Sequence, residues 1–162
     1  MSQTSINEAQ QAGFPGLLAD MFPDGIESLI QAEASAAIAF GWAVKLGTGD
    51  RDALKIASDA DTIRGLVVHG HGYSKGSNAP QLDAVGVLPK NRLSVARFGR
   101  MWVLSNSTVA AGARAHYNVT NNRWASAGGA GFVDATGQVT FLDSVTGAGQ
   151  LVRIEFDFRN KP

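Results

Sequence analysis

The sequence contains no cysteine, which excludes disulfide bonds and thiolate metal sites. It has no run of about 18 apolar residues, so no membrane-spanning helix is expected. The N-terminal stretch MSQTSINEAQQAGF lacks the basic and apolar regions of a signal peptide, and we therefore expect the protein to be made in a cytoplasm. Charged residues are scarce at 17%, which favours a surface that partly meets protein rather than water.

An excess of basic residues is also absent. The 14 Lys and Arg residues are scattered along the chain and balanced by 14 Asp and Glu residues, so the formal net charge is +0. Proteins that bind nucleic acid usually carry a basic patch that neutralises the phosphates. We therefore expect no direct nucleic-acid partner.

Glycine, in contrast, is abundant, with 19 residues in a chain of 162. The glycines separate short apolar runs, and this pattern is typical of an all-β chain with many turns. A chain of this length has enough residues for one domain with a single core. The sequence predicts an all-β fold, a compact β-barrel or sandwich, with an extended N-terminal arm.

In the closing segment 151–158, LVRIEFDF, apolar and charged side chains alternate from Val152 onward, which predicts a strand with one buried face. Its charged face is expected to meet water or a polar subunit contact. Two hairpins are predicted upstream, one turning at Phe98-Gly99 and one at Asn121-Asn122, since Gly and Asn tolerate turn conformations. A further turn is expected at Thr136-Gly137.

Residues 25–47, GIESLIQAEASAAIAFGWAVKLG, support two interpretations. The Ala, Glu and Gln residues favour a helix. The stretch IAFGWAVKL is more typical of a strand. The residues alone leave this choice open.

Residues 1–22 are interpreted as an arm and residues 23–162 as a single β domain. The first eleven residues are polar and cannot bury enough surface to order themselves. The following stretch GFPGLLADMFPD is apolar, and its two prolines oppose a continuous helix. Such a segment is expected to lie across another surface, either on a partner or on its own domain.

One motif suggests catalysis. Residues 72–76, Gly-Tyr-Ser-Lys-Gly, fit the G-x-S-x-G pattern of a hydrolase nucleophile elbow. That elbow needs a helix after Ser74, followed by an acid and then a histidine. The next residues contain prolines and no helical period, and Asp83 is the only acid between Ser74 and His116. We therefore assign no catalytic residue.

Two histidines and three tryptophans are candidate binding residues. His69 and His71 would share one face of a strand, as some metal sites require, but no H-E-x-x-H pattern accompanies them. We expect no metal and no other cofactor. Trp42 and Trp102 lie in apolar strand patterns and are expected in the core. Trp124 follows the Asn-Asn turn and is the candidate for an exposed interface aromatic.

The order of these segments resembles the structural cement, or head decoration, proteins of tailed bacteriophages. The resemblance rests on FPGLLAD near the start, on IESLIQAEASAAIAFGWAVKLGTGD and on IRGLVVHGH. LSVARFGRMWVLS is the most telling piece, and VAAGARAHYN and ATGQVTFLDSVTGAGQLVRIEFD match the closing strands. The motifs span about 145 residues, and the loop 74–91 matches least.

The resemblance implies a β-barrel or sandwich in which residues 26–46 form strands. It also implies a homotrimer, without enzymatic activity, that binds the major capsid protein on the outside of the shell, in the virion. The capsid-contact residues that we expect are Phe14, Pro15, Leu17 and Phe22 on the arm, together with Trp124. Deleting residues 1–22 is expected to leave a folded protein that no longer binds shells. The alternative function is a carbohydrate- or receptor-binding β module of a virion tail or fibre.

Overall fold

The computed structural model of the protein describes residues 13–19, 25–70 and 86–159. These ranges form β-strands and no helix, which confirms the predicted all-β class, and none of them contains a helix able to cross a membrane. The strands are β1 (Ile26–Gln31), β2 (Ala43–Leu46), β3 (Asp52–Lys55), β4 (Gly65–Val67), β5 (Arg92–Ala96), β6 (Phe98–Leu104), β7 (His116–Asn118), β8 (Arg123–Ala125), β9 (Phe132–Asp134), β10 (Val139–Phe141) and β11 (Leu151–Asp157).

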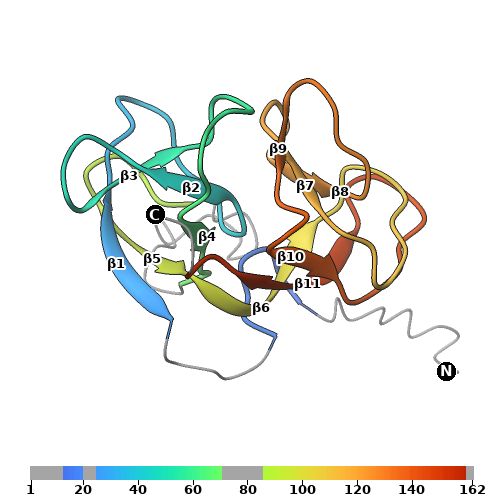
Figure 1. The fold of residues 1–162 in the computed structure, drawn as a ribbon. Coiled ribbons are helices and arrows are strands. Elements are labelled where there is room, and N and C mark those ends of the chain that lie inside the picture. Colours follow the sequence, from blue (N-terminus) through green and yellow to red (C-terminus); the bar gives the residue numbers. More distant parts are fainter. Residues whose placement is uncertain (1–12, 20–24, 71–85, 160–162) are drawn as a thin grey trace, which may run out of the picture.

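Strands β1 to β5 close into a barrel in the order β1-β3-β2-β4-β5 (Figure 1). β1 and β3 run parallel, and the other neighbours run antiparallel. The strand interpretation of residues 26–46, which the family resemblance implied, is therefore confirmed for β1 and β2. The helical interpretation is wrong because pairing with β3 and β5 overrides the local preference of the Ala and Glu residues.

The expected hairpin at Phe98-Gly99 is not formed. β5 pairs with β1 and β4 inside the barrel, whereas β6 pairs with β11 in a different sheet. The two strands are consecutive parts of one path that passes from the barrel into the sheets through Arg97. The Arg97 amide donates to the Gly25 carbonyl, and the Arg97 carbonyl accepts from the Phe158 amide, so this junction is held on both sides.

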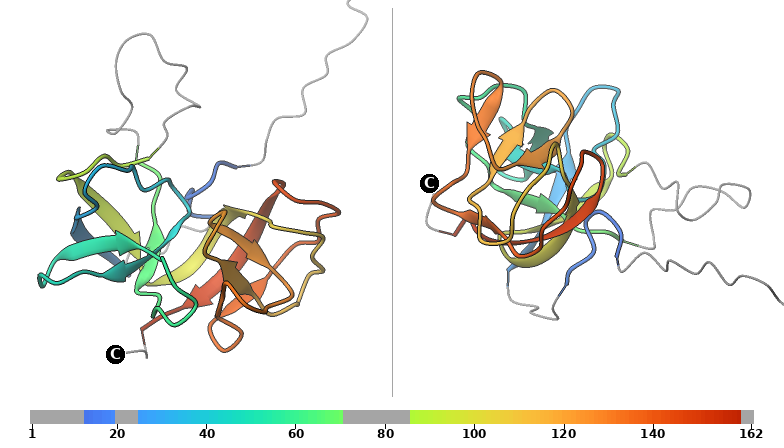
Figure 2. Two further views of the ribbon diagram at one scale, coloured as in Figure 1. Left: turned by 90° about the horizontal axis from the view of Figure 1, so that it is seen from above. Right: turned by 90° about the vertical axis from the view of Figure 1, so that its right-hand side faces the viewer.

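The second half of the molecule contains two three-stranded sheets, ordered β10-β11-β6 and β8-β7-β9, beside the barrel (Figure 2). The alternation of β11 is confirmed, with Ile154 buried and its neighbours Arg153 and Glu155 exposed. The hairpin at the Asn-Asn turn is also confirmed: β7 pairs with β8, and Asn122 takes a φ of 57°. The expected turn at Thr136-Gly137 leads from β9 into β10.

Two clusters of buried side chains form the core. The smaller cluster fills the barrel and consists of Leu29, Ile38, Phe40, Val44, Ala53, Val67, Val87, Leu93 and Val95. The larger cluster lies in the sheets, yet it also includes Ala43, Leu66 and Ala96 from β2, β4 and β5 of the barrel. The barrel and the sheets therefore share one apolar interface. Burial of this kind contributes about 25 cal/mol for each Å² of apolar surface removed from water.

Candidate interaction surface

Residues 13–19 lie along the edge of β6 that β11 leaves open. Gly16 and Ala19 donate backbone hydrogen bonds to Trp102 and Arg100 at 2.8 Å, and the Trp102 amide donates to Leu17 at 2.9 Å. This part of the predicted arm therefore packs on its own domain, which was one of the two alternatives. An extended segment that pairs with a sheet edge also shields that edge from other chains.

The contact between this segment and the barrel is very close. Gly16 has a φ of 79°, and a Cβ added there would lie 2.7 Å from the backbone nitrogen of Gly41. The Gly16 carbonyl accepts a hydrogen bond from the His69 amide at 2.8 Å. The His69 ring in turn packs against the rings of Phe14 and Phe40, with centroid distances of 5.9 and 4.6 Å. Only a residue without a side chain fits at position 16.

Three of the five predicted contact residues, Phe14, Pro15 and Leu17, thus lie together on this docked segment, and each is half-buried. The neighbouring Leu18 turns inward and packs against the larger core cluster. Phe22 lies outside the described residues. The deletion of residues 1–22 would remove Leu18 from the core and uncover the edge of β6, so single substitutions are a cleaner test of this surface.

The expectation that Trp124 is exposed is wrong. Trp124 is completely buried, and its ring meets Tyr117 edge-on at a centroid distance of 5.0 Å. The cause is the register of the hairpin, which places Tyr117 directly opposite Trp124 on the inner face of the sheet. Trp42 and Trp102, which were expected in the core, are each only partly buried, and Trp42 packs against the barrel cluster. Trp102 lies on the outer face of β6, with the Arg153 guanidinium 5.6 Å from its ring.

Of His69, His71 and Ser74, the structure describes only His69. His69 packs between aromatic rings as described above, while His71 and Ser74 lie outside the described residues. Across the ranges 13–19, 25–70 and 86–159, no group of three or more His, Cys, Asp or Glu side chains is placed to hold a metal ion.

The sequence did not reveal a groove on the outer face of β6, β11 and β10. A hollow of about 560 Å³ meets a second one of about 260 Å³, and they share Phe98 and Arg159. We call the two together the sheet groove. The first is lined by Phe98, Gly99, Arg100, Arg114, Gly137, Gln138, Thr140, Glu155, Phe156, Asp157 and Arg159, and the second by Gly25, Ile26, Glu27, Arg97, Phe98 and Arg159.

Strand register explains why these charged side chains meet. Glu155 of β11 pairs with Arg100 of β6 on one side and with Thr140 of β10 on the other. An isolated bridge then joins Thr140 to Arg114. The four side chains form a row, Arg100-Glu155-Thr140-Arg114, across four neighbouring segments. Side chains directly opposite on one face of a sheet lie about 5 Å apart.

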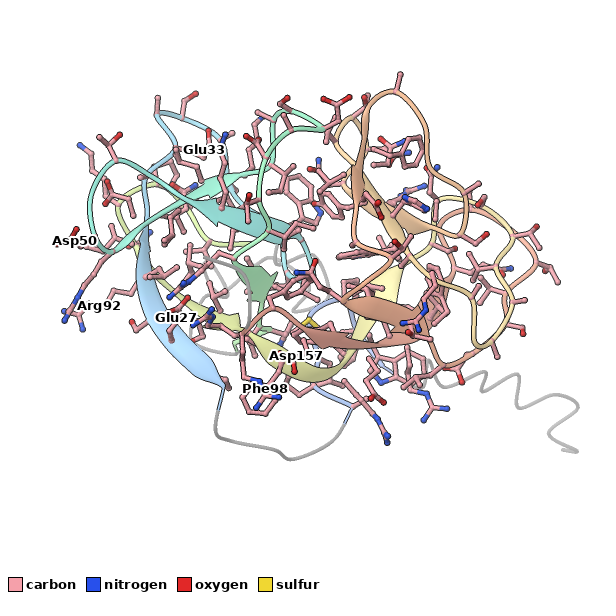
Figure 3. All side chains as sticks on the ribbon, viewed as in Figure 1. Glu27, Glu33, Asp50, Arg92, Phe98 and Asp157 are labelled. Atoms are coloured by element: carbon pink, nitrogen blue, oxygen red, sulfur yellow. The ribbon has the colours of Figure 1, made fainter. Side chains whose placement is uncertain are left out.

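The next row along the groove contains Asp157 and Phe98, which lie side by side in Figure 3. Arg159 donates two hydrogen bonds to the Asp157 carboxylate, and its guanidinium lies 4.2 Å from the centre of the Phe98 ring. The side-chain hydrogen bonds from Arg159, helped by the Arg159 backbone amide, lower the pKa of Asp157 to about 2. The same ion pair raises the pKa of Arg159.

One sequence signal pointed toward the groove. The charged face of residues 151–158 was expected to meet water or a polar subunit contact, and it supplies Glu155 and Asp157. The arginines opposite them come from segments distant in sequence. Their arrangement depends on strand register between β6, β10 and β11, which periodicity alone does not give.

Comparisons with known proteins agree with the fold. A family model described as structural cement protein (E217 gp24/Pam3 gp6) matches residues 2–157. A chain in the solved structure "The capsid of Myoviridae Phage XM1" is similar with a TM-score of 0.64 and 13% identity. That alignment covers 96% of this chain and 98% of the other, and at this identity it shows the fold alone. A search of curated proteins finds no match.

The family match spans nearly the whole chain, and the β-barrel with its accompanying sheets agrees with the similarity to a chain of a solved phage capsid. The resemblance noted from FPGLLAD, LSVARFGRMWVLS and the closing strands is thereby confirmed. The protein belongs to the family of phage structural cement proteins.

Proposed function

We propose that this protein binds the outer face of a tailed-phage head and bridges neighbouring subunits of the major capsid protein, which stabilises the shell. The observation that carries the proposal is the match of residues 2–157 to the family model of structural cement proteins. The similarity to a chain of a solved phage capsid supports it. The protein would be made in the cytoplasm of the bacterial host and would then reside on the virion surface.

A homotrimer is the assembly that we propose. A trimer that touches several capsid subunits makes each further contact intramolecular, so that weak individual contacts add up to tight binding. The docked segment 13–19 offers such a contact, because Phe14, Pro15 and Leu17 are half-exposed and held by backbone pairing to β6. A preordered contact loses less conformational entropy on binding than a disordered arm would.

The proposed role is purely adhesive. We propose no catalysis, no cofactor, and no direct binding to nucleic acid or membrane. The balanced net charge of +0 supports the restriction on nucleic acid, since a protein that neutralises phosphates carries excess positive charge. A stabilising protein needs only complementary surfaces that remain in place when the packed genome pushes the shell outward.

The experiment that tests the proposal is co-sedimentation of the purified protein with cognate heads that lack it. The native protein should sediment with the heads and raise their temperature of disruption. Leu17→Ser should weaken binding, whereas Leu46→Ser, which changes a 42% exposed leucine elsewhere, is the matched control. A native protein that stays in the supernatant would overturn the function. Equal binding of both variants would reject only the role of segment 13–19.

The oligomer has a separate test. Light scattering of the purified protein should give three times the chain mass of 17.0 kDa. A monomer at micromolar concentration that still binds heads would contradict the trimer and leave the capsid role intact.

A further inference from the structure

We propose that the sheet groove is the place where an extended, acidic segment of the major capsid protein docks. The inference rests on the proposed function and specifies its contact surface. Three observations carry it: an arginine that pairs with no acidic side chain of the described residues, two glycines whose bare backbone lines the groove, and an accessible aromatic ring where the two hollows meet.

The charge balance of the groove indicates the sign of its occupant. Arg100 pairs with Glu155 at 3.0 Å, and Arg159 pairs with Asp157 at 2.6 Å. Arg114, at the end of the row, donates to the neutral Thr140 hydroxyl at 3.1 Å, and no acidic side chain within the described ranges pairs with it. A carboxylate placed beside Arg114 would complete an alternating row of charges. Arginine can hold a carboxylate with two parallel hydrogen bonds, which fixes its orientation.

The shape of the groove indicates an extended backbone. Gly99 and Gly137 both line it, and a Cβ built on either would meet no atom within 4 Å. At both positions the protein therefore presents bare backbone to the groove. Glycine at such sites allows another backbone to approach closely. A folded, convex partner surface would not need this, whereas an extended peptide would.

Phe98 lies where the two hollows meet, half-exposed and covered on one side by the Arg159 guanidinium. Beyond it the second hollow reaches Ile26, whose side chain is 44% exposed. Arg114 and Phe98 line the first hollow, and Phe98 and Ile26 line the second, so the two apolar side chains lie farther along the groove than Arg114. The occupant that fits the whole groove is therefore an extended segment with a carboxylate at one end and an apolar side chain farther along.

The test uses the full-length protein and shells assembled from the cognate major capsid protein. Arg114→Glu reverses the charge at the acidic position and should weaken binding at least tenfold. Arg92→Glu is its matched control, because Arg92 is also exposed but does not line the groove, and Figure 3 shows it away from Phe98 and Asp157. Gly137→Leu should fill the groove and weaken binding similarly. Gly147→Leu is its control, since a Cβ at Gly147 also meets nothing and the residue lies outside the groove.

The outcomes separate the inference from the function on which it rests. Loss of binding in the two groove variants, with normal binding by both controls, supports the groove as the docking site. Native-like binding by all four variants overturns the groove while leaving the capsid role in place. Shells that fail to bind even the native protein overturn both. If the groove variants bind shells normally but lose self-association, the occupant is a second copy of this chain, and the inference is wrong.

Discussion

Tyr117 shows how a single buried hydroxyl ties the barrel to the sheets. Its oxygen accepts a hydrogen bond from the Ala43 amide of β2 and donates to the Asn122 side chain, each at 3.2 Å. Complete burial raises the pKa of this phenol, so it remains neutral and able to donate. Tyr117→Phe would leave the Ala43 amide buried without a partner.

We expect Tyr117→Phe to lower the free energy of unfolding by about 1–3 kcal/mol, the cost of an unsatisfied buried donor. Urea denaturation measures this loss. Ser28→Ala, which removes an exposed hydroxyl on β1, is the control and should leave the midpoint nearly unchanged. Equal midpoints for Tyr117→Phe and the native protein would show that the Ala43 amide finds another acceptor.

The contribution of Asp157 to the free energy of unfolding is expected to depend on pH. Its pKa in the folded protein is about 2, below the value of about 3.9 for an unperturbed aspartate. The carboxylate therefore stabilises the fold above about pH 4, and this contribution is lost as the pH falls toward 2. Because the side chain is 41% exposed, solvent screening should keep the effect under about 1 kcal/mol. An NMR titration of the carboxyl carbon should show the low midpoint, and Arg159→Gln should raise it.

Single residues also show where reasoning from the sequence succeeded and where it failed. The alternation in β11 identified which residues are buried, because a strand has only two faces. Trp124 was misplaced because its exposure depends on the partner strand, and only the register reveals Tyr117 opposite it. Arg114 was not considered at all, since its importance arises from a bridge to Thr140 far along the chain.

The arrangement of elements was less accessible to sequence reasoning than their existence. Strands were expected near β5, β6, β7, β8 and β11, and they are present. The path from β5 to β6 was misjudged because a glycine after an apolar run fits a hairpin and a bend equally well. Local sequence does not determine which strand pairs with which. Here β5 pairs with β1 in the barrel, whereas β6 pairs with β11 in a separate sheet.

The docked segment 13–19 provides a prediction at this level. Gly16→Ala would force a positive φ on alanine and place its Cβ against the backbone of Gly41. Gly112→Ala is the matched control, because Gly112 has a similar φ of 82° and a Cβ there meets no atom within 4 Å. The control carries only the conformational cost, of the order of 1 kcal/mol. The difference between the two variants therefore measures the steric contact.

We expect Gly16→Ala to release segment 13–19, so that the Trp102 amide, which donates to Leu17, exchanges its hydrogen faster than in the Gly112→Ala variant. Hydrogen-exchange mass spectrometry of the peptides covering β6 would detect this. If the β6 amides exchange equally slowly in both variants, segment 13–19 tolerates a side chain at position 16. In that case the close contact with Gly41 does not hold the segment in place.

For the molecule as a whole, the continuous path from β5 to β6 and the shared core make the barrel and the sheets mechanically dependent on each other. Ala43, Leu66 and Ala96 bury their side chains against the sheets while their strands build the barrel. Opening either part would expose the apolar surface of the other. A shell-stabilising protein gains from this arrangement, because a force applied at one contact is distributed over the whole fold.

The expected consequence is a single cooperative unfolding transition. Native-state hydrogen exchange should give the same opening free energy for the slowest amides of β2 in the barrel and of β11 in the sheets. Two-state behaviour of this kind is usual for small single domains and is favoured here by the shared cluster. A barrel that opens at least 2 kcal/mol more easily than β11 would show two independent units joined only at Arg97. In that case the groove, whose two hollows are lined by β1 and β11, would lose its shape whenever the barrel opened.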